Sequence, residues 1–240
     1  MWRGGNSARP ICFGSDPSKL EDYLVPSVII FDGRIVSVPF TRDERGITIE
    51  YAIPNFKMCL ACVGGPSNDC EPANCTLSNW SVALSIFRSA KDAVSFVNAV
   101  FLGVLIFRSR NLVREELRKQ GVKGPIRWSA NLAVPERYMD DSPTLRCFDD
   151  VLRIAWLMSS VYEDYPDLSK FEELLDCYIS AKQSLEVAPL LDCFVYPEVG
   201  AEVASVTMSR SAKQGLYAFV DIGAGTVDAS VFRFHRGIRP

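Results

Sequence analysis

The segment 216–234 combines residue types that bind phosphate groups in proteins. An apolar run ends in Asp221, a glycine-rich turn follows, and an alternating segment comes after the turn. Glycine allows positive φ angles, so backbone N–H groups can approach an anion with no Cβ in the way. A carboxylate at the end of a buried strand, such as Asp221, can hold a hydrated Mg²⁺ through its waters. The predicted phosphate-binding turn consists of Gly223, Ala224, Gly225 and Thr226.

The placement of this turn separates it from two other phosphate-binding motifs. The turn joins two predicted strands, whereas the glycine turn of a dinucleotide fingerprint opens a helix, and a P-loop needs Gly-Lys-Ser/Thr. For an isolated G-x-G turn, a plain hairpin with a solvated aspartate remains the alternative. The string from the apolar run through Asp221 to Asp228 is more specific than its glycines alone.

Composition narrows the classes of protein to which the chain can belong. Its 240 residues are 48% hydrophobic, which is enough for a sizeable core, and its net charge is -3. Nucleic-acid binding proteins usually show a basic domain or stripe, so no nucleic-acid partner is expected. His235 is the single histidine, which argues against His-rich metal sites and Ser-His-Asp catalysis. Chemistry is therefore expected from carboxylates, lysine, hydroxyls and the backbone.

The distribution of apolar residues predicts a cytoplasmic protein with no membrane partner. Residues 1–16 contain no apolar stretch of the length that a secretory signal needs, and the cysteines are expected to be reduced thiols. The most apolar segment, Ala93–Phe107, is about 15 residues long, whereas a membrane span needs about 20. We predict a buried helix there.

Local patterns in the first half of the chain predict sheet followed by helix. Two strands, Val28–Phe31 and Arg34–Val38, are joined by the pair Asp32-Gly33, which is a strong hairpin signal. Residues 59–80, rich in Cys and Pro, are predicted to be loop or irregular structure. Residues 82–119 have apolar positions at helical spacing and are expected to end before Gly121.

The second half begins with an alternating strand, residues 126–134, that ends at Pro135. Ser142 before Pro143 predicts the N-cap of a long amphipathic helix. Its apolar face consists of Leu145, Phe148, Leu152, Ala155 and Trp156.

A second helix is expected to open with the capping box Ser169-x-x-Glu172. A short apolar segment at 185–195, a helix at about 198–208 and a polar loop at 209–215 follow. The apolar face predicted for the second helix consists of Phe171, Leu174, Leu175, Tyr178 and Ile179.

The string that ends at Asp228 resembles the second phosphate-binding hairpin of the actin, hexokinase and heat-shock-chaperone ATPase superfamily, most closely the DnaK-like chaperones. Other segments resemble those chaperones in the same order along the chain, so the resemblance covers nearly all of it. These segments are the strand entry Val25–Val28, the lysine-bearing stretch Phe56–Met58, the strand Asn131–Pro135, and the glutamate-led helix from Pro197 to Ala204.

The resemblance implies an α/β fold, a ribonuclease-H-like lobe with a mixed sheet and flanking helices. Residues 1–197 would form an incomplete first lobe with an insertion at about 160–185. Residues 198–240 would form a linking helix and the opening hairpin of a second lobe.

The resemblance also implies a nucleotide ligand, ATP or ADP, with Mg²⁺. Lys57 would be catalytic by stabilising the γ-phosphate and the attacking water. Glu198 and Asp221 would hold the hydrated Mg²⁺, and the turn residues would contact phosphates. Phosphoryl transfer depends mainly on such positioning and electrostatics. Protein clients or co-chaperones are the partners of such ATPases.

The chain departs from the family pattern in ways that affect the expected activity. No aspartate-x-glycine-threonine hairpin precedes Pro26, most of the second lobe is absent, and Val199 stands where the chaperones place proline. A fragment or degenerate ATP-binding relative with little activity alone is therefore expected. The alternative is a non-catalytic interaction module that retains the fold without the nucleotide.

Four cysteines lie close together in the sequence, at positions 59, 62, 70 and 75. A CxxC pair with two further cysteines can form a tetrahedral zinc site. The second pair is spaced irregularly for a zinc ribbon, which favours reduced structural thiols. The four residues are Cys59, Cys62, Cys70 and Cys75.

Overall fold

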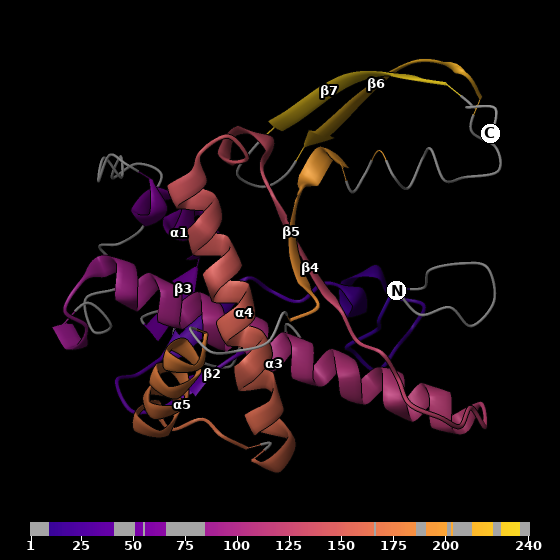
Figure 1. Ribbon diagram of the computed structural model, residues 1–240. Helices are drawn as coiled ribbons and strands as arrows, with labels where there is room; N and C mark the ends of the chain where they lie inside the picture. The colour runs from indigo at the N-terminus through magenta and orange to yellow at the C-terminus, as the bar shows by residue number, and fades with distance from the viewer. Residues whose placement is uncertain are drawn as a thin grey trace.

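The chain folds into long helices and small β-sheets, in the mixed α/β class expected from the sequence (Figure 1). The computed structural model describes residues 10–40, 51–54, 56–65, 85–165, 167–185, 191–200, 203, 213–222 and 227–235. In chain order the elements are 3-10 helix η1 (Leu20–Tyr23), strands β1 (Val28–Phe31), β2 (Val36–Ser37) and β3 (Ala52–Pro54), helices α1 (Phe56–Gly64) and α3 (Ala90–Lys119), strand β4 (Ala130–Val134), 3-10 helix η5 (Glu136–Tyr138), helices α4 (Ser142–Asp164) and α5 (Phe171–Ser184), and strands β5 (Cys193–Pro197), β6 (Gly215–Ile222) and β7 (Val227–Phe234).

The hairpin predicted around Asp32-Gly33 is confirmed. Strands β1 and β2 pair antiparallel, and β3 pairs on the other side of β1, so the order is β2-β1-β3. Gly33 has a φ of 93°, and the Asp32 carboxylate accepts hydrogen bonds from the N–H groups of Arg34 and Ile35, each at 2.8 Å. Glycine adopts this φ without steric cost, which explains why the turn forms here.

Helix α5 begins later than its predicted capping box. Ser169 is not the N-cap, because its carbonyl accepts a hydrogen bond from the N–H of Val36 at 2.7 Å and Lys170 forms a bridge with Ile35. Pairing with the β2 edge therefore keeps this stretch extended and moves the helix start to Phe171. The predicted apolar face is correct for Phe171, Leu174 and Tyr178 but wrong for Ile179, which is 43% exposed.

Helix α3 is buried among the other elements along much of its apolar half, as the sequence predicts for 93–107. It starts at Ala90 rather than near 82, because Ser89 caps a new helix by accepting from the Asp92 N–H at 3.1 Å. It ends before Gly121, as expected, and Gly121 has a φ of +70°. Among the described residues α3 has the length and composition of a membrane span, yet 56% of its apolar window is buried within the molecule.

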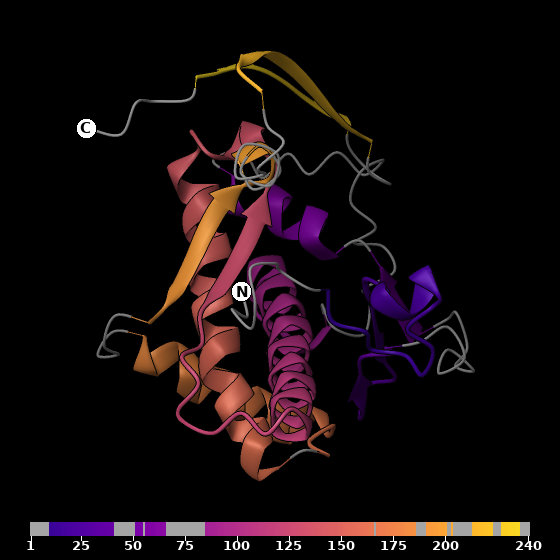
Figure 2. The same ribbon diagram turned by 90° about the vertical axis from the view of Figure 1, so that its right-hand side faces the viewer.

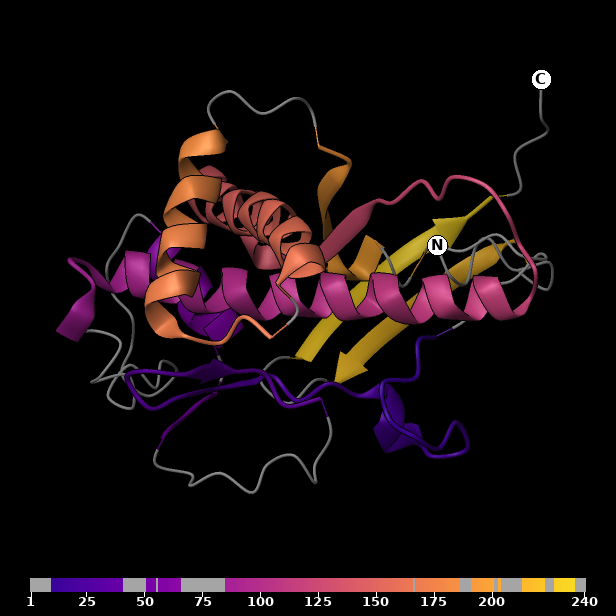
Figure 3. The same ribbon diagram turned by 90° about the horizontal axis from the view of Figure 1, so that it is seen from below.

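The core lies on two sides of α3. Figure 3 shows the β1–β3 sheet on one side of this helix and α4 and α5 on the other. Aromatic rings connect the layers: Phe171 of α5 lies 5.0 Å from Phe31 of β1 and 5.5 Å from Phe96 of α3, centroid to centroid. Burial of such large rings dominates the stability of small cores.

Helices α3 and α4 approach closely where they cross. A Cβ added to Gly103 would lie 3.3 Å from the carbonyl oxygen of Ala155, so only glycine fits there without displacement. The predicted long helix after Pro135 is confirmed as α4, with Asp141 rather than Ser142 as N-cap. The Asp141 carboxylate accepts a hydrogen bond from the Thr144 hydroxyl in the first turn of α4.

Strands β4 and β5 form a parallel pair with Val134 opposite Pro197. The predicted strand ends at Pro135, as expected, but it starts at Ala130 instead of 126. The first paired residue of β5 is Cys193, opposite Ala130, so residues 126–129 have no partner strand among the described residues. The described strands thus form separate antiparallel and parallel sheets rather than the single mixed sheet implied by the resemblance.

The two strands predicted on either side of the glycine turn are confirmed as β6 and β7. They pair antiparallel in the register that places Asp221 opposite Asp228 and Ile222 opposite Val227. Leu216 and Val231 are 68% and 70% exposed. The two-stranded sheet of β6 and β7 lies beyond the carboxyl ends of β4 and β5 in both Figure 1 and Figure 2.

Candidate functional site

Lys57 lies in the first turn of α1, whose start is fixed against α3. Its neighbour Phe56 is 3% exposed, and the Phe56 ring lies 4.8 Å from that of Phe101. The side-chain amide of Asn98, buried in α3, donates to the Phe56 carbonyl at 2.9 Å. A buried amide that bonds to a neighbouring backbone restrains both elements. The chain therefore presents Lys57 from a well-anchored backbone.

Glu198 follows the last residue of β5 directly. The end of β5 is fixed by Pro197, which pairs with the fully buried Val134, and by Val199, which is 8% exposed. Figure 2 shows the arrowheads of β4 and β5 pointing to the same end of the molecule, beside α1. In open α/β sheets, ligands bind at the carboxyl ends of parallel strands. Glu198 occupies that position.

The structure brings Lys57 and Glu198 together, although 141 residues separate them. The Lys57 ammonium donates a hydrogen bond to Oε1 of Glu198, and the two groups form an ion pair. The Lys57 side chain is 40% exposed and that of Glu198 is 19% exposed, so both reach solvent. Partly exposed pairs of this kind contribute about 0–1 kcal/mol to stability. Both charged groups are accessible to a ligand at the strand ends.

The third predicted catalytic residue, Asp221, lies in β6 one residue before that strand ends. Its backbone is placed by the pairing with Asp228. The predicted phosphate-contacting residues Gly223, Ala224, Gly225 and Thr226 lie outside the described residues, as does the helix expected at 198–208 apart from 198–200 and 203.

The cysteine cluster begins in a helix rather than in the predicted loop. Residues 59–64 belong to α1, because its apolar side packs against α3 and α4. Cys59 is fully buried there and Cys62 is half-buried, while Cys70 and Cys75 lie outside the described residues. Within the described parts of the chain, no group of three or more potential metal ligands occurs.

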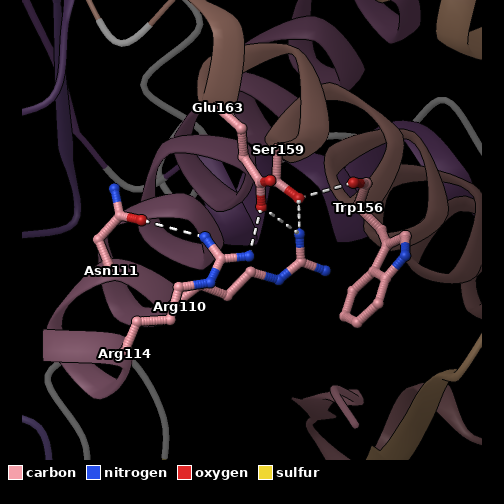
Figure 4. A network of polar contacts seen from close by, with 6 residues as sticks. All are labelled: Arg110, Asn111, Arg114, Trp156, Ser159 and Glu163. Atoms are coloured by element: carbon pink, nitrogen blue, oxygen red, sulfur yellow. Dashed lines mark hydrogen bonds and ion pairs between the residues drawn. The ribbon is translucent and has the colours of Figure 1, made fainter. Parts of the chain in front are cut away.

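A second polar site, centred on Arg110, was missed by the sequence analysis. Arg110 is 6% exposed, and its Nη1 donates to the hydroxyl of Ser159 at 2.8 Å (Figure 4). Its guanidinium carbon lies 4.0 Å from the centroid of the Trp156 ring. Glu163 lies 4.0 Å from Nη1 and also accepts from Arg114 at 2.8 Å. Burial lowers the pKa of Arg110, and the charge of Glu163 opposes that shift.

The sequence contained one signal for this site. Within the charged run after Phe107, three buried positions follow one another at spacings of three and seven. Spacings of that kind place residues on one helix face. A charged residue on a buried helix face needs a polar or charged partner. The position of Arg110 on this face therefore indicates a buried polar contact. These buried positions are Phe107, Arg110 and Leu117.

Comparison with known proteins gives no assignment for this fold or site. No family model, no curated protein and no solved structure matches the chain. The geometry around Lys57 and Glu198 and the resemblance of the motifs are therefore the basis for a functional proposal.

Proposed function

We propose that this protein binds ATP or ADP with Mg²⁺ at the carboxyl ends of β4 and β5, as the DnaK-like chaperone ATPases that it resembles do. The observation that supports the proposal is the pairing of Lys57 with Glu198 at those strand ends. The resemblance assigned these two residues to one site on motifs far apart in the sequence. A chance resemblance would not require the two side chains to be in contact.

The charges of Lys57 and Glu198 can be compensated in two ways, by each other without nucleotide and by the phosphates and Mg²⁺ when nucleotide is bound. In the described structure each charge is compensated by the other. A bound polyphosphate would take Lys57 as a counter-charge and leave the Glu198 carboxylate for the waters of Mg²⁺. Mg²⁺ retains several waters and needs only one or two carboxylates, which fits Glu198 and Asp221 as the donor set. When bound, the ion would neutralise charge on the phosphates.

The order of elements supports the finer proposal of a ribonuclease-H-like lobe. An antiparallel β2-β1-β3 sheet is followed by helices and by a parallel strand pair whose crossover contains α4 and α5. We propose nucleotide binding with little or no hydrolysis by this chain alone.

The test is nucleotide binding measured by isothermal titration calorimetry, with ADP in the presence of Mg²⁺ and again in EDTA. We expect saturable binding that depends on Mg²⁺ and is weakened about 10-fold or more by Lys57→Met and by Glu198→Gln, because a charged hydrogen bond contributes about 1.5–3 kcal/mol.

Lys182→Met is the matched control for these variants. Lys182 also forms an ion pair between distant elements, with Asp92 at 3.0 Å, but on the α5 side of the molecule. Equal loss in this control, or absence of Mg²⁺-dependent ADP binding in the unaltered protein, would overturn the proposal and favour the non-catalytic interaction module.

A further inference from the structure

A cavity of about 750 Å³ lies between the C-terminal half of α3, the segment 122–132 and α4. Its volume falls within the range of small-molecule sites, about 300–1,000 Å³. It borders the amino-terminal part of β4, whereas Lys57 and Glu198 lie at the carboxyl end of that strand. Its apolar lining includes Leu102, Leu105, Ile106, Val113, Trp128 and Trp156.

The charged residues that line this cavity have one sign. Three basic residues contribute to its wall, and no acidic residue does so among the described residues. The Arg127 side chain is exposed and pairs with Asp192 at 3.3 Å, outside the cavity lining. Arg110 differs from the other two because it is buried. The basic residues of the wall are Arg110, Lys123 and Arg127.

Arg110 uses only one side of its guanidinium for contacts with the protein. Nη1 donates to Ser159 and faces Glu163. Nε is buried and has no hydrogen-bond partner among the described residues, where the hydrogen bond of this guanidinium is the one from Nη1 to Ser159. In Figure 4 the two remaining nitrogens of Arg110 lie away from the side that faces Ser159 and Glu163. A buried donor without a partner is costly, so its presence calls for an explanation.

The unused edge has the geometry of a specific acceptor site. The N–H groups of Nε and Nη2 point in parallel along one edge of the guanidinium, which matches the two oxygens of a carboxylate. The Trp156 ring at 4.0 Å and the Trp128 ring at 6.0 Å hold the plane of the Arg110 guanidinium. The two rings thus restrict the orientation of this edge, and Arg110 is one of the residues that line the apolar cavity.

We propose that this cavity binds a small amphipathic monocarboxylate, with the carboxylate on Nε and Nη2 of Arg110 and the apolar body against the side chains of α3 and the two tryptophans. The ligand supplies the acceptors that the protein does not, and its apolar body fills the remaining volume. A cavity whose charged residues are all basic disfavours cations. A neutral ligand can accept a hydrogen bond from Arg110 but adds no charge to compensate the guanidinium, so its hydrogen bonds are weaker than those of a carboxylate.

Binding is tested with decanoate below its micelle concentration, by calorimetry and by the fluorescence of the cavity tryptophans. Decanol, which has the same chain and no charge, is the comparison ligand. We expect one saturable decanoate site and about 10- to 100-fold weaker binding of decanol, because the charged hydrogen bonds are lost.

Three variants decide whether Arg110 is responsible. Arg110→Lys retains the charge but removes the parallel donor pair, and we expect about a 10-fold or greater loss of decanoate affinity. Arg114→Lys is the matched control, because Arg114 lies on the next turn of α3 and does not line the cavity. Ser109→Phe fills the cavity and leaves Arg110 intact, so it should also abolish binding.

Several results would overturn the proposal. One is absence of saturable decanoate binding to the unaltered protein, which is also the result expected if the cavity accepts a peptide strand along β4 instead. Another is equal affinity for decanol and decanoate. A third is retention of full affinity in Arg110→Lys while that protein remains folded by circular dichroism. None of these measurements depends on nucleotide binding at Lys57 and Glu198.

Discussion

Replacing Arg110 by methionine should leave the free energy of unfolding nearly unchanged, although Arg110 is among the most buried charged residues in the described part of the chain. The three closest favourable contacts that are lost are the hydrogen bond to Ser159 at 2.8 Å, the pair with Glu163 at 4.0 Å, and the stacking on Trp156 at 4.0 Å. Their contributions are about 1.5–3, 0–1 and 0.5–2 kcal/mol.

The opposing contribution comes from removing a poorly satisfied charge from the interior. Burial lowers the pKa of Arg110, which means that the protein environment disfavours its charged form. Desolvation of a buried ion costs several kcal/mol, and the unpartnered Nε adds about 1–3 kcal/mol. Methionine retains the apolar stem and relieves both costs. The gains and losses then nearly cancel, to within about 1–2 kcal/mol.

Ser159→Ala provides the contrast, because it leaves the charge buried and removes a partner. Nη1 of Arg110 then loses its hydrogen bond, and we expect destabilisation by about 1–3 kcal/mol. Both variants are compared by urea unfolding followed by circular dichroism, with Arg114→Met as an exposed control on the same helix. Destabilisation by Arg110→Met well beyond that of Ser159→Ala would refute the reasoning and show that Arg110 mainly stabilises the fold.

Three further changes have predictable effects on the free energy of unfolding in urea. Gly103→Val should destabilise by about 1–3 kcal/mol, because a Cβ would meet the Ala155 carbonyl at 3.3 Å; an unchanged value would contradict the tight helix crossing. Phe96→Ala should cost about 3–5 kcal/mol, because the ring is 2% exposed and contacts the rings of Phe171 and Tyr178; a loss below 1 kcal/mol would argue against that cluster. The free energy of unfolding should fall as the pH rises from about 9 towards 11, because burial raises the pKa of Cys193 from 9.0 to about 11 and the Cys193 thiol therefore loses its proton first in the unfolded chain. Cys193→Ala should reduce this fall, and an identical pH profile in that variant would count against Cys193 as the cause.

Elements whose ends depend on local backbone chemistry were predicted well from the sequence. The Asp32-Gly33 pair determines its hairpin because Gly33 accepts a positive φ and the Asp32 carboxylate bonds to the following N–H groups. The end of α3 before Gly121 and the end of β4 at Pro135 follow from the same kind of local preference.

Elements whose limits depend on a distant partner were predicted less well. Ser169 satisfies a capping pattern, yet its carbonyl pairs with Val36, and that pairing delays α5. The first residue of β4 is determined by where β5 begins, at Cys193. Cys59 and Cys62 fall in a helix because the surface formed by α3 and α4 buries the apolar side of α1. Periodicity within a segment contains no information about such partners.

The same distinction applies to the two sites. Composition and spacing could not bring Lys57 to Glu198 across 141 residues, and only the motif resemblance linked them. Arg110 lay within a run of charged residues, where a solvated helix face is the usual outcome. Its burial depends on contacts with Ser159 and Trp156 of α4, a helix distant in the sequence.

Neither proposed site is needed to hold the fold together, which makes both suitable for testing by substitution. Helix α1 is held by Phe56, Cys59 and Leu60, each at most 3% exposed, whereas the ion pair of Lys57 contributes about 1 kcal/mol or less. Arg110 makes contacts whose gain is offset by its burial. Loss of ligand binding in variants of either residue, with the unfolding transition preserved, therefore reports on recognition rather than on folding.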